Sequence, residues 1–268
     1  MLNFRDTKLE RNDVKLKALW TIPLSTITLV LPLYLWRTLY PYSDWALLFL
    51  LFVGVVLFIG VFSLTILLHQ AKMKIALRSD SPFSKFFKGR LYAGFVALVF
   101  IGVALPVLAW QSLIVQPVEA ACLLVLSVAA GSASLGISAW LQSHLTSLFA
   151  QSAGIKIGAI AMAIAFIPIL IWINSNYVIR PGEIHTASLS QAIILAINEL
   201  PARRGWISEV LSVFYAMDAA KLWIVVEYKG YRWVALLYVF DSALVSFVLA
   251  SISTIIPNSI SYILKGTH

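Results

Sequence analysis

Six apolar runs, each long enough to cross a lipid bilayer as a helix, dominate this sequence. A membrane-spanning helix needs about 20 apolar residues at a rise of 1.5 Å each. Of the 268 residues, 60% are hydrophobic and only 12% are charged, and a soluble chain of this size has too little polar surface to cover such a core. We therefore predict an all-α integral membrane protein with six transmembrane helices, and not a soluble enzyme, a coiled coil or a disordered tail. The predicted spans are about 18–36, 45–69, 91–115, 119–141, 157–178 and 233–256.

The charges between these runs indicate the orientation of the chain. The segment 71–90 carries six basic residues against Asp80 alone, whereas the connections between spans one and two and between spans three and four carry few charges. The positive-inside rule then places the N-terminus, this segment and the 142–156 turn in the cytoplasm, and six spans return the C-terminus to the same side. The net charge of +8 thus indicates orientation and contact with anionic lipid rather than binding to nucleic acid. We expect a multi-pass protein of the inner (plasma) membrane.

The remaining segments define the domain organisation. Residues 1–17 combine five basic and three acidic residues, which predicts a short amphipathic helix or elbow on the cytoplasmic surface. Residues 18–268 contain no internal repeat and form a single transmembrane domain.

The segment 179–232 is expected on the outer side, because its six basic and five acidic residues nearly cancel. Pro181-Gly182 and Pro201 divide it into two helical pieces, about 187–200 and 205–228. Within the second piece, Asp218 and Lys221 are one turn apart and close enough to pair. We expect a re-entrant or interfacial helical hairpin packed against the spans. The alternative is that 205–228 is a seventh, protein-buried span, which would move the C-terminus outside.

Asp241 is the one carboxylate inside a predicted span. A buried charge of this kind normally faces the helix bundle or a watery cavity. We expect Asp241 to face the bundle or a dimer interface, with a hydroxyl or amide donor within reach. It can line a path, cap a helix or pair across an interface, and both a functional and a structural role remain open. The candidate donors are Asn174, Asn176, Tyr177 and Arg180.

The sequence lacks the common catalytic motifs. It has no GxxxxGK(S/T) phosphate loop, no HExxH and no GxSxG. Cys122 is the single cysteine, so an intrachain disulfide and a multi-cysteine metal site are excluded. His69 and His144 lie near the same membrane face and could ligate a haem, but both sit at the extreme ends of their spans, which favours ordinary interfacial polar residues. We expect no enzyme activity, resident cofactor or metal in this chain.

Small residues in spans four and five predict close helix packing instead of chemistry. Ser134 and Ser138 lie four residues apart in span four, and Gly154 and Gly158 repeat the spacing at the start of span five.

The order of elements resembles the six-span permease subunits of type-2 ABC exporters, which move drugs, lantibiotics, polysaccharides and lipids. Three strings are similar to that family: the stretch 76–91 (ALRSDSPFSKFFKGRL), the small-residue stretch 130–138 (AGSASLGIS) and the stretch 211–215 (LSVFY). The resemblance implies a cytoplasmic coupling helix between spans two and three. The sequence departs from the family where Lys74 and Arg78 replace an acidic residue that often precedes this turn.

Six residues of the coupling segment are candidates for contact with a partner. Asp80 or Ser81 is suited to the N-cap of the coupling helix and Pro82 to its first position. Its apolar face would be formed by Phe83, Phe86 and Phe87.

The function implied by the resemblance is that of a permease subunit. ATP would be bound by a separate cytoplasmic ATPase subunit docked on this segment, and two permease chains, identical or different, would form the path across the bilayer. Two other functions stay open: a non-catalytic anchor or assembly subunit of a larger inner-membrane complex, and a pore-forming membrane effector. An intramembrane enzyme is the least favoured, because no two catalytic groups converge at one depth.

Overall fold

The computed structural model describes residues 4–76, 89–176, 188–200, 205–228, 231 and 233–265, and within these ranges the chain is helical, with no strand. Six of the helices are long and apolar enough to cross a membrane, which confirms the predicted class and the number of spans. The elements are α1 (Phe4–Leu39), the short 3-10 helix η1 (Asp44–Ala46), α2 (Leu47–Ala76), α4 (Arg90–Ile114), α5 (Pro117–Leu141), α6 (Ser147–Asn176), α7 (Leu189–Asn198), α8 (Trp206–Glu227) and α9 (Val234–Lys265).

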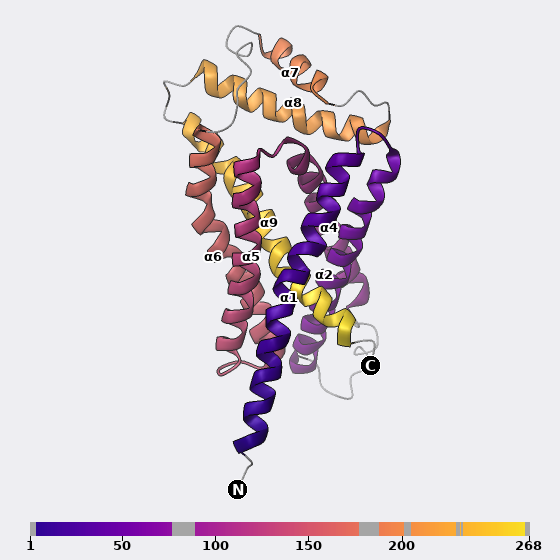
Figure 1. Cartoon of the computed structure of the whole chain (residues 1–268), viewed down its shortest axis with the longest axis vertical. Helices are drawn as coiled ribbons and strands as arrows, with labels where there is room; N and C mark the ends of the chain where they lie inside the picture. The colour runs from indigo at the N-terminus through magenta and orange to yellow at the C-terminus, as the bar shows by residue number, and fades with distance from the viewer. Residues whose placement is uncertain are drawn as a thin grey trace.

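The long helices run side by side as a bundle, and two shorter helices lie across one end of it (Figure 1). We call the end covered by α7 and α8 the α8 end. Both chain termini lie at the opposite end, which we call the terminal end (Figure 1). The helix α9 crosses the bundle diagonally, and its span is the most buried of the six (Figure 1). The helix α8 is not among the helices that are apolar enough to span a membrane.

The starts of two spanning helices differ clearly from the sequence prediction. The fifth spanning helix begins at Ser147, ten residues before the predicted start at 157, because the polar and small residues before Ile157 are compatible with a helix although they are less apolar. The helix α1 begins at Phe4 and continues unbroken into the first span, so the chain has no elbow near residue 17. Neither glycine nor proline occurs between Phe4 and Trp20 to end the helix there. This first part of α1 extends beyond the other helices (Figure 1).

Small polar side chains hold α9 in the middle of the bundle. The Ser246 hydroxyl donates to the backbone carbonyl of Ala163 on α6 at 2.9 Å, and the Ser253 hydroxyl donates to the Ser127 hydroxyl on α5 at 2.9 Å. Serine is short enough to let helix backbones approach closely while adding a hydrogen bond in an apolar surrounding.

The close contact between α5 and α6 confirms the predicted small-residue packing. A Cβ atom on Gly154 would lie 2.9 Å from the Ser134 carbonyl oxygen and 2.8 Å from the Ser138 backbone nitrogen. A Cβ on Gly158 would lie 3.0 Å from the Ser134 backbone. Both glycines are thus required by the proximity of the two backbones.

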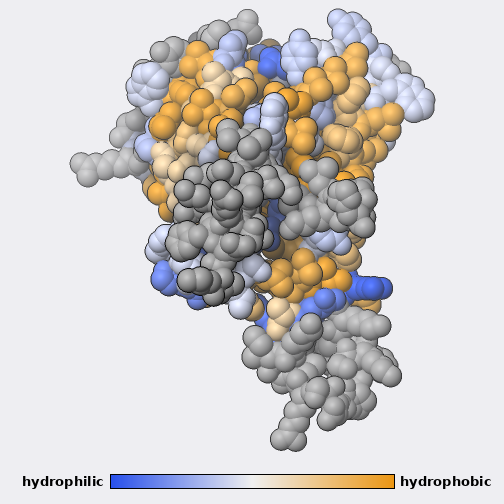
Figure 2. Space-filling model, turned by 60° about the horizontal axis from the view of Figure 1, so that its bottom comes forward, coloured by the Kyte–Doolittle hydropathy of each residue, from blue (hydrophilic) through white to orange (hydrophobic). Residues whose placement is uncertain are grey.

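The sides of the bundle carry an apolar surface suited to lipid. Large apolar side chains such as Phe95, Ile164 and Phe240 are more than 60% exposed. In the view of Figure 2, apolar side chains cover much of the described surface, and hydrophilic side chains occur along its upper edge and again in the lower half. Exposed tryptophans and tyrosines occur toward both ends of the spans, where aromatic residues anchor a protein at the two membrane–water interfaces. They are Trp20, Tyr92, Trp140 and Tyr262 at the terminal end, and Tyr42, Trp45, Trp172 and Trp233 at the α8 end.

Candidate functional site: a polar cluster beneath α8

Aromatic and apolar side chains seat α8 on the end of the bundle. Leu211 is 2% exposed and packs in one core cluster with Trp36, in the last turn of α1, and Tyr40, which directly follows α1. Phe214 stacks on Trp110 of α4 with 5.9 Å between the ring centroids. These contacts fix the face of α8 that lies against the spans, and the charged residues of α8 are positioned from there.

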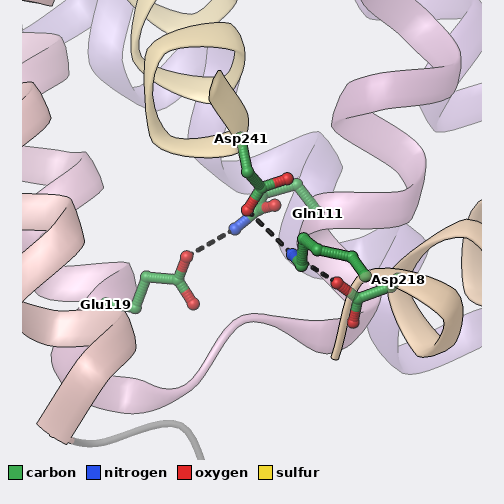
Figure 3. A network of polar contacts seen from close by, with 5 residues as sticks. Gln111, Glu119, Asp218 and Asp241 are labelled. Carbon is green, nitrogen blue, oxygen red and sulfur yellow. Dashed lines mark hydrogen bonds and ion pairs between the residues drawn. The ribbon is translucent and has the colours of Figure 1, made fainter. Parts of the chain in front are cut away.

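One ammonium group links α8 to the last spanning helix. Lys221 Nζ lies 2.5 Å from Asp218 Oδ1, one turn earlier in α8, and 2.9 Å from Asp241 Oδ2 in α9 (Figure 3). The three side chains are 19–25% exposed, so the ion pairs are only partly screened by solvent. Burial by itself would lower the pKa of Lys221, but the two carboxylates stabilise its charge and together raise the pKa above its usual range.

A second contact joins α4 to α5 beside this ion pair. Gln111 Nε2 donates a hydrogen bond to Glu119 Oε1 at 2.7 Å, and both side chains are less than 10% exposed (Figure 3). Glu119 lies in the first turn of α5, just after Pro117, and also accepts from the Gln116 backbone N–H. A carboxylate is favoured there because the first turn of a helix presents unpaired N–H groups and the positive end of the helix dipole.

The two contacts belong to one electrostatic unit, which we call the polar cluster: Gln111, Glu119, Asp218, Lys221 and Asp241. Lys221 and Asp241 both interact electrostatically with Glu119. Two carboxylates, those of Asp218 and Asp241, thus pair with a single ammonium group, while the Glu119 carboxyl bonds to Gln111. Within the part of the chain that the structure describes, three or more His, Cys, Asp or Glu residues nowhere gather as a metal site.

Tyr215, on the same helix, lies within the electrostatic influence of Asp218 and of Arg37 on α1. Burial, followed by the charges of Glu199, Tyr40 and Asp218, raises the pKa of Tyr215 to about 12, while Arg37 opposes the shift. The phenol is therefore neutral at any physiological pH.

Among the described residues, the donor to Asp241 is an ammonium group on α8, that of Lys221, whereas a hydroxyl or amide donor was expected. The side chains of Asn174 and Asn176 and the residues Tyr177 and Arg180 lie outside the described part of the chain. Lys221 reaches Asp241 because α8 folds back over the end of the bundle, which the sequence pattern alone does not specify.

The coupling candidates Asp80, Ser81, Pro82, Phe83, Phe86 and Phe87 lie outside the described residues.

The two histidines considered for haem each pack on a separate aromatic ring. His69 lies beside Tyr92, with 5.7 Å between ring centroids, and His144 lies beside Trp140 at 5.7 Å. The α4 residue Tyr92 and the neighbouring Gly89, whose φ is +69°, therefore form the surroundings of His69.

Two members of the polar cluster were missed by the sequence analysis. Neither Glu119 nor Gln111 was named as a candidate site residue. A signal was present, because an acid two residues after Pro117 is typical of a helix start. The partner of Glu119, eight residues earlier on another helix, could not be found from local spacing.

Comparison with known proteins does not assign the chain to a family. No family model, no curated protein and no solved structure matches the chain. The polar cluster and the helices that carry it are therefore the guide to function.

Proposed function

We propose that this chain is the membrane-spanning permease subunit of an ATP-driven exporter and works as a dimer with separate cytoplasmic ATPase subunits. The observation that carries the proposal is the 2.9 Å ion pair from Lys221 to Asp241, which joins a helix lying across the bundle to a helix that crosses it. Such a bond allows a movement of the span to seat or release the covering helix. The order of six spans with a helical pair before the last one supports the same function.

In this proposal, α7 and α8 cover the outer end of the path. ATP binding by the partner subunits would push on the segment that includes Phe83, Phe86 and Phe87, and the spans would rock between inward-open and outward-open arrangements. The diagonal, deeply packed α9 would carry that movement to Asp241. The Lys221–Asp241 bond would then hold α8 down in one arrangement and release it in the other.

The experiment begins with purification of the full chain from its native membrane in mild detergent. A cytoplasmic ATPase should co-purify, and Phe86→Ser should release it without affecting membrane insertion, because buried aromatic anchors carry much of an interface's energy. Purification with other membrane proteins and no ATPase would favour an assembly subunit. Depolarisation of cells by expression of the chain alone would favour a pore-forming effector.

The role of the ion pair is tested with a matched pair of variants. Asp241→Asn removes the carboxylate that links α8 to α9, whereas Asp218→Asn removes the carboxylate that pairs with Lys221 inside α8. We expect Asp241→Asn to alter ATP hydrolysis by the purified complex several-fold more than Asp218→Asn, at equal complex yield. Equal effects of the two variants on hydrolysis, or a loss of complex yield with Asp241→Asn alone, would contradict the proposal.

A further inference from the structure

An apolar pocket opens on the flank of the bundle next to the polar cluster, and Gln111 of that cluster forms part of its lining. Its volume is about 300 Å³, and its walls come from α1, α4, α5 and α9. The inner wall is formed by Leu29, Leu108 and Leu249, which are each less than 10% exposed. At the mouth, Tyr34 of α1 and Leu124 of α5 are 62% and 44% exposed. The pocket therefore opens sideways between α1 and α5, toward the surface that faces lipid.

The pocket has the length of one lipid leaflet. Its α1 wall extends from Leu29 to Arg37, a rise of about 12 Å at 1.5 Å per residue. The hydrocarbon layer of a single leaflet is about 15 Å thick, half of the bilayer core. The pocket thus runs alongside the acyl chains of the leaflet at the α8 end and stops close to its headgroups.

A single cation marks the headgroup end. Arg37 lines the pocket, is exposed, and donates from Nη1 to the Val115 carbonyl at 3.0 Å. Among the residues that the structure describes, no carboxylate forms an ion pair with Arg37, since Glu119 is engaged by Gln111 instead. Arginine presents several N–H donors in a planar fork, and one carbonyl leaves donors free for an anion such as a phosphate.

We propose that this pocket binds one acyl chain of an anionic phospholipid, with Arg37 pairing to the headgroup phosphate. The apolar walls match the chain, the sideways mouth admits it from the bilayer, and the Arg37 guanidinium, which forms an ion pair with no described carboxylate, matches the charge of the headgroup. The binding concerns the flank of the bundle and is independent of whether the chain transports a substrate.

The test uses the full chain in lipid nanodiscs that contain a small fraction of phosphatidylglycerol with a diazirine in its acyl chain. After irradiation, peptide mapping should place the label on residues of the pocket wall, such as Leu124 and Val248. Phosphatidylcholine with the same chain is the neutral probe and should label these residues about tenfold less, as expected for the loss of one charge-assisted contact. Glycerol phosphate added in solution should not compete, because it lacks the acyl chain.

Four variants assign the site. Arg37→Gln should reduce labelling by phosphatidylglycerol to the level of phosphatidylcholine, while Arg37→Lys should retain most of it. Ala121→Phe places a ring at the exposed mouth and should reduce labelling by both lipids. Arg90→Gln removes an exposed arginine at the terminal end of α4 and should change nothing.

Labelling outside the pocket, or equal labelling by the two lipids in the unaltered chain, would overturn the proposal. So would unchanged phosphatidylglycerol labelling in Arg37→Gln. Thermal unfolding of each variant shows whether it is folded. If Arg37→Gln does not fold, the comparison of the two lipids in the unaltered chain and in Arg37→Lys still tests the proposal.

Discussion

At the scale of single residues, Lys221 is the group on which the α8 end depends. It satisfies a carboxylate on its own helix and a carboxylate on α9 at once. A partly buried charge that loses its partner is left with an uncompensated cost of desolvation, whereas loss of both charges leaves none. Substitutions in this cluster should therefore be strongly non-additive.

The first prediction compares single and double replacements of the ion pair. Lys221→Met leaves two carboxylates without their cation, and we expect it to destabilise the protein by about 1–3 kcal/mol. Adding Asp241→Leu to it should recover part of that loss, because the second change removes one of the orphaned charges. Unfolding of the purified protein in detergent measures the cycle, and purely additive effects would show that the two groups do not interact.

The second prediction follows from the raised pKa of Lys221. A higher pKa leaves less free amine at a given pH, so acetic anhydride at pH 9 should acetylate Lys221 more slowly than the exposed Lys72. The stability that the ammonium contributes is complete below the pKa of an unfolded lysine, about 10.4, and is lost as the pH rises through the higher pKa of the folded protein. Asp241→Asn should make Lys221 react faster, and mass spectrometry of the acetylated peptides reads both rates. Equal rates before and after the substitution would argue against the pairing.

Some contacts of the polar cluster could be predicted from the sequence and others could not. The burial of Asp241 and its orientation toward the bundle follow from the cost of a charge in lipid, and the pairing of Asp218 with Lys221 follows from helical spacing. The link between Lys221 and Asp241, and that between Gln111 and Glu119, depend on how separate helices meet. Neither is specified by local spacing.

At the scale of elements, small residues decide how closely the helices approach. The contact of α5 with α6 was predictable because four small residues recur at a spacing of four, and the glycine positions confirm it. The extent of α1 was not predictable in the same way, because charged residues continue a helix as readily as apolar ones when no breaker intervenes. The positions of α7 and α8 along the sequence followed from their prolines and periodicity, but their placement across the bundle required the tertiary structure.

The third prediction tests the α5–α6 contact. Gly154→Val would bring side-chain atoms against the backbone of Ser134 and Ser138, and we expect a loss of about 1–3 kcal/mol or a failure to assemble the bundle. Gly136→Val on α5 is the matched control, because a Cβ atom there meets nothing within 4 Å. Thermal unfolding in detergent should separate the two variants by several degrees. Similar midpoints would mean that α5 and α6 are not in close contact in solution.

At the scale of the whole molecule, an even number of spans places both termini at one end of the bundle. The basic stretches of the sequence, residues 1–17 and 71–90, are joined to that same end. The arrangement of the helices does not indicate which side of a membrane this end faces, and the charge distribution predicts the cytoplasmic side.

The fourth prediction concerns that orientation. Single cysteines at positions 3, 80, 190 and 267, introduced in a Cys122→Ala background, should be labelled by an impermeant maleimide only at 190 in intact cells. All four should react after the membrane is permeabilised. Labelling of position 267 from outside would mean that the number of crossings is odd and that α8 crosses the bilayer.

The unbroken α1 has a mechanical consequence. From Phe4 to Leu19 the helix continues beyond the Trp20 end of the first span, a distance of about 24 Å at 1.5 Å per residue. A continuous helix of that length would act as a lever arm, so a tilt of the first span by about 10° would displace its tip by roughly 4 Å. Small rotations inside the bilayer would thus become movements large enough to make or break contacts in the water beyond the headgroups. In the opposite direction, a force applied near residue 4 would act on the first span with the full leverage of that arm.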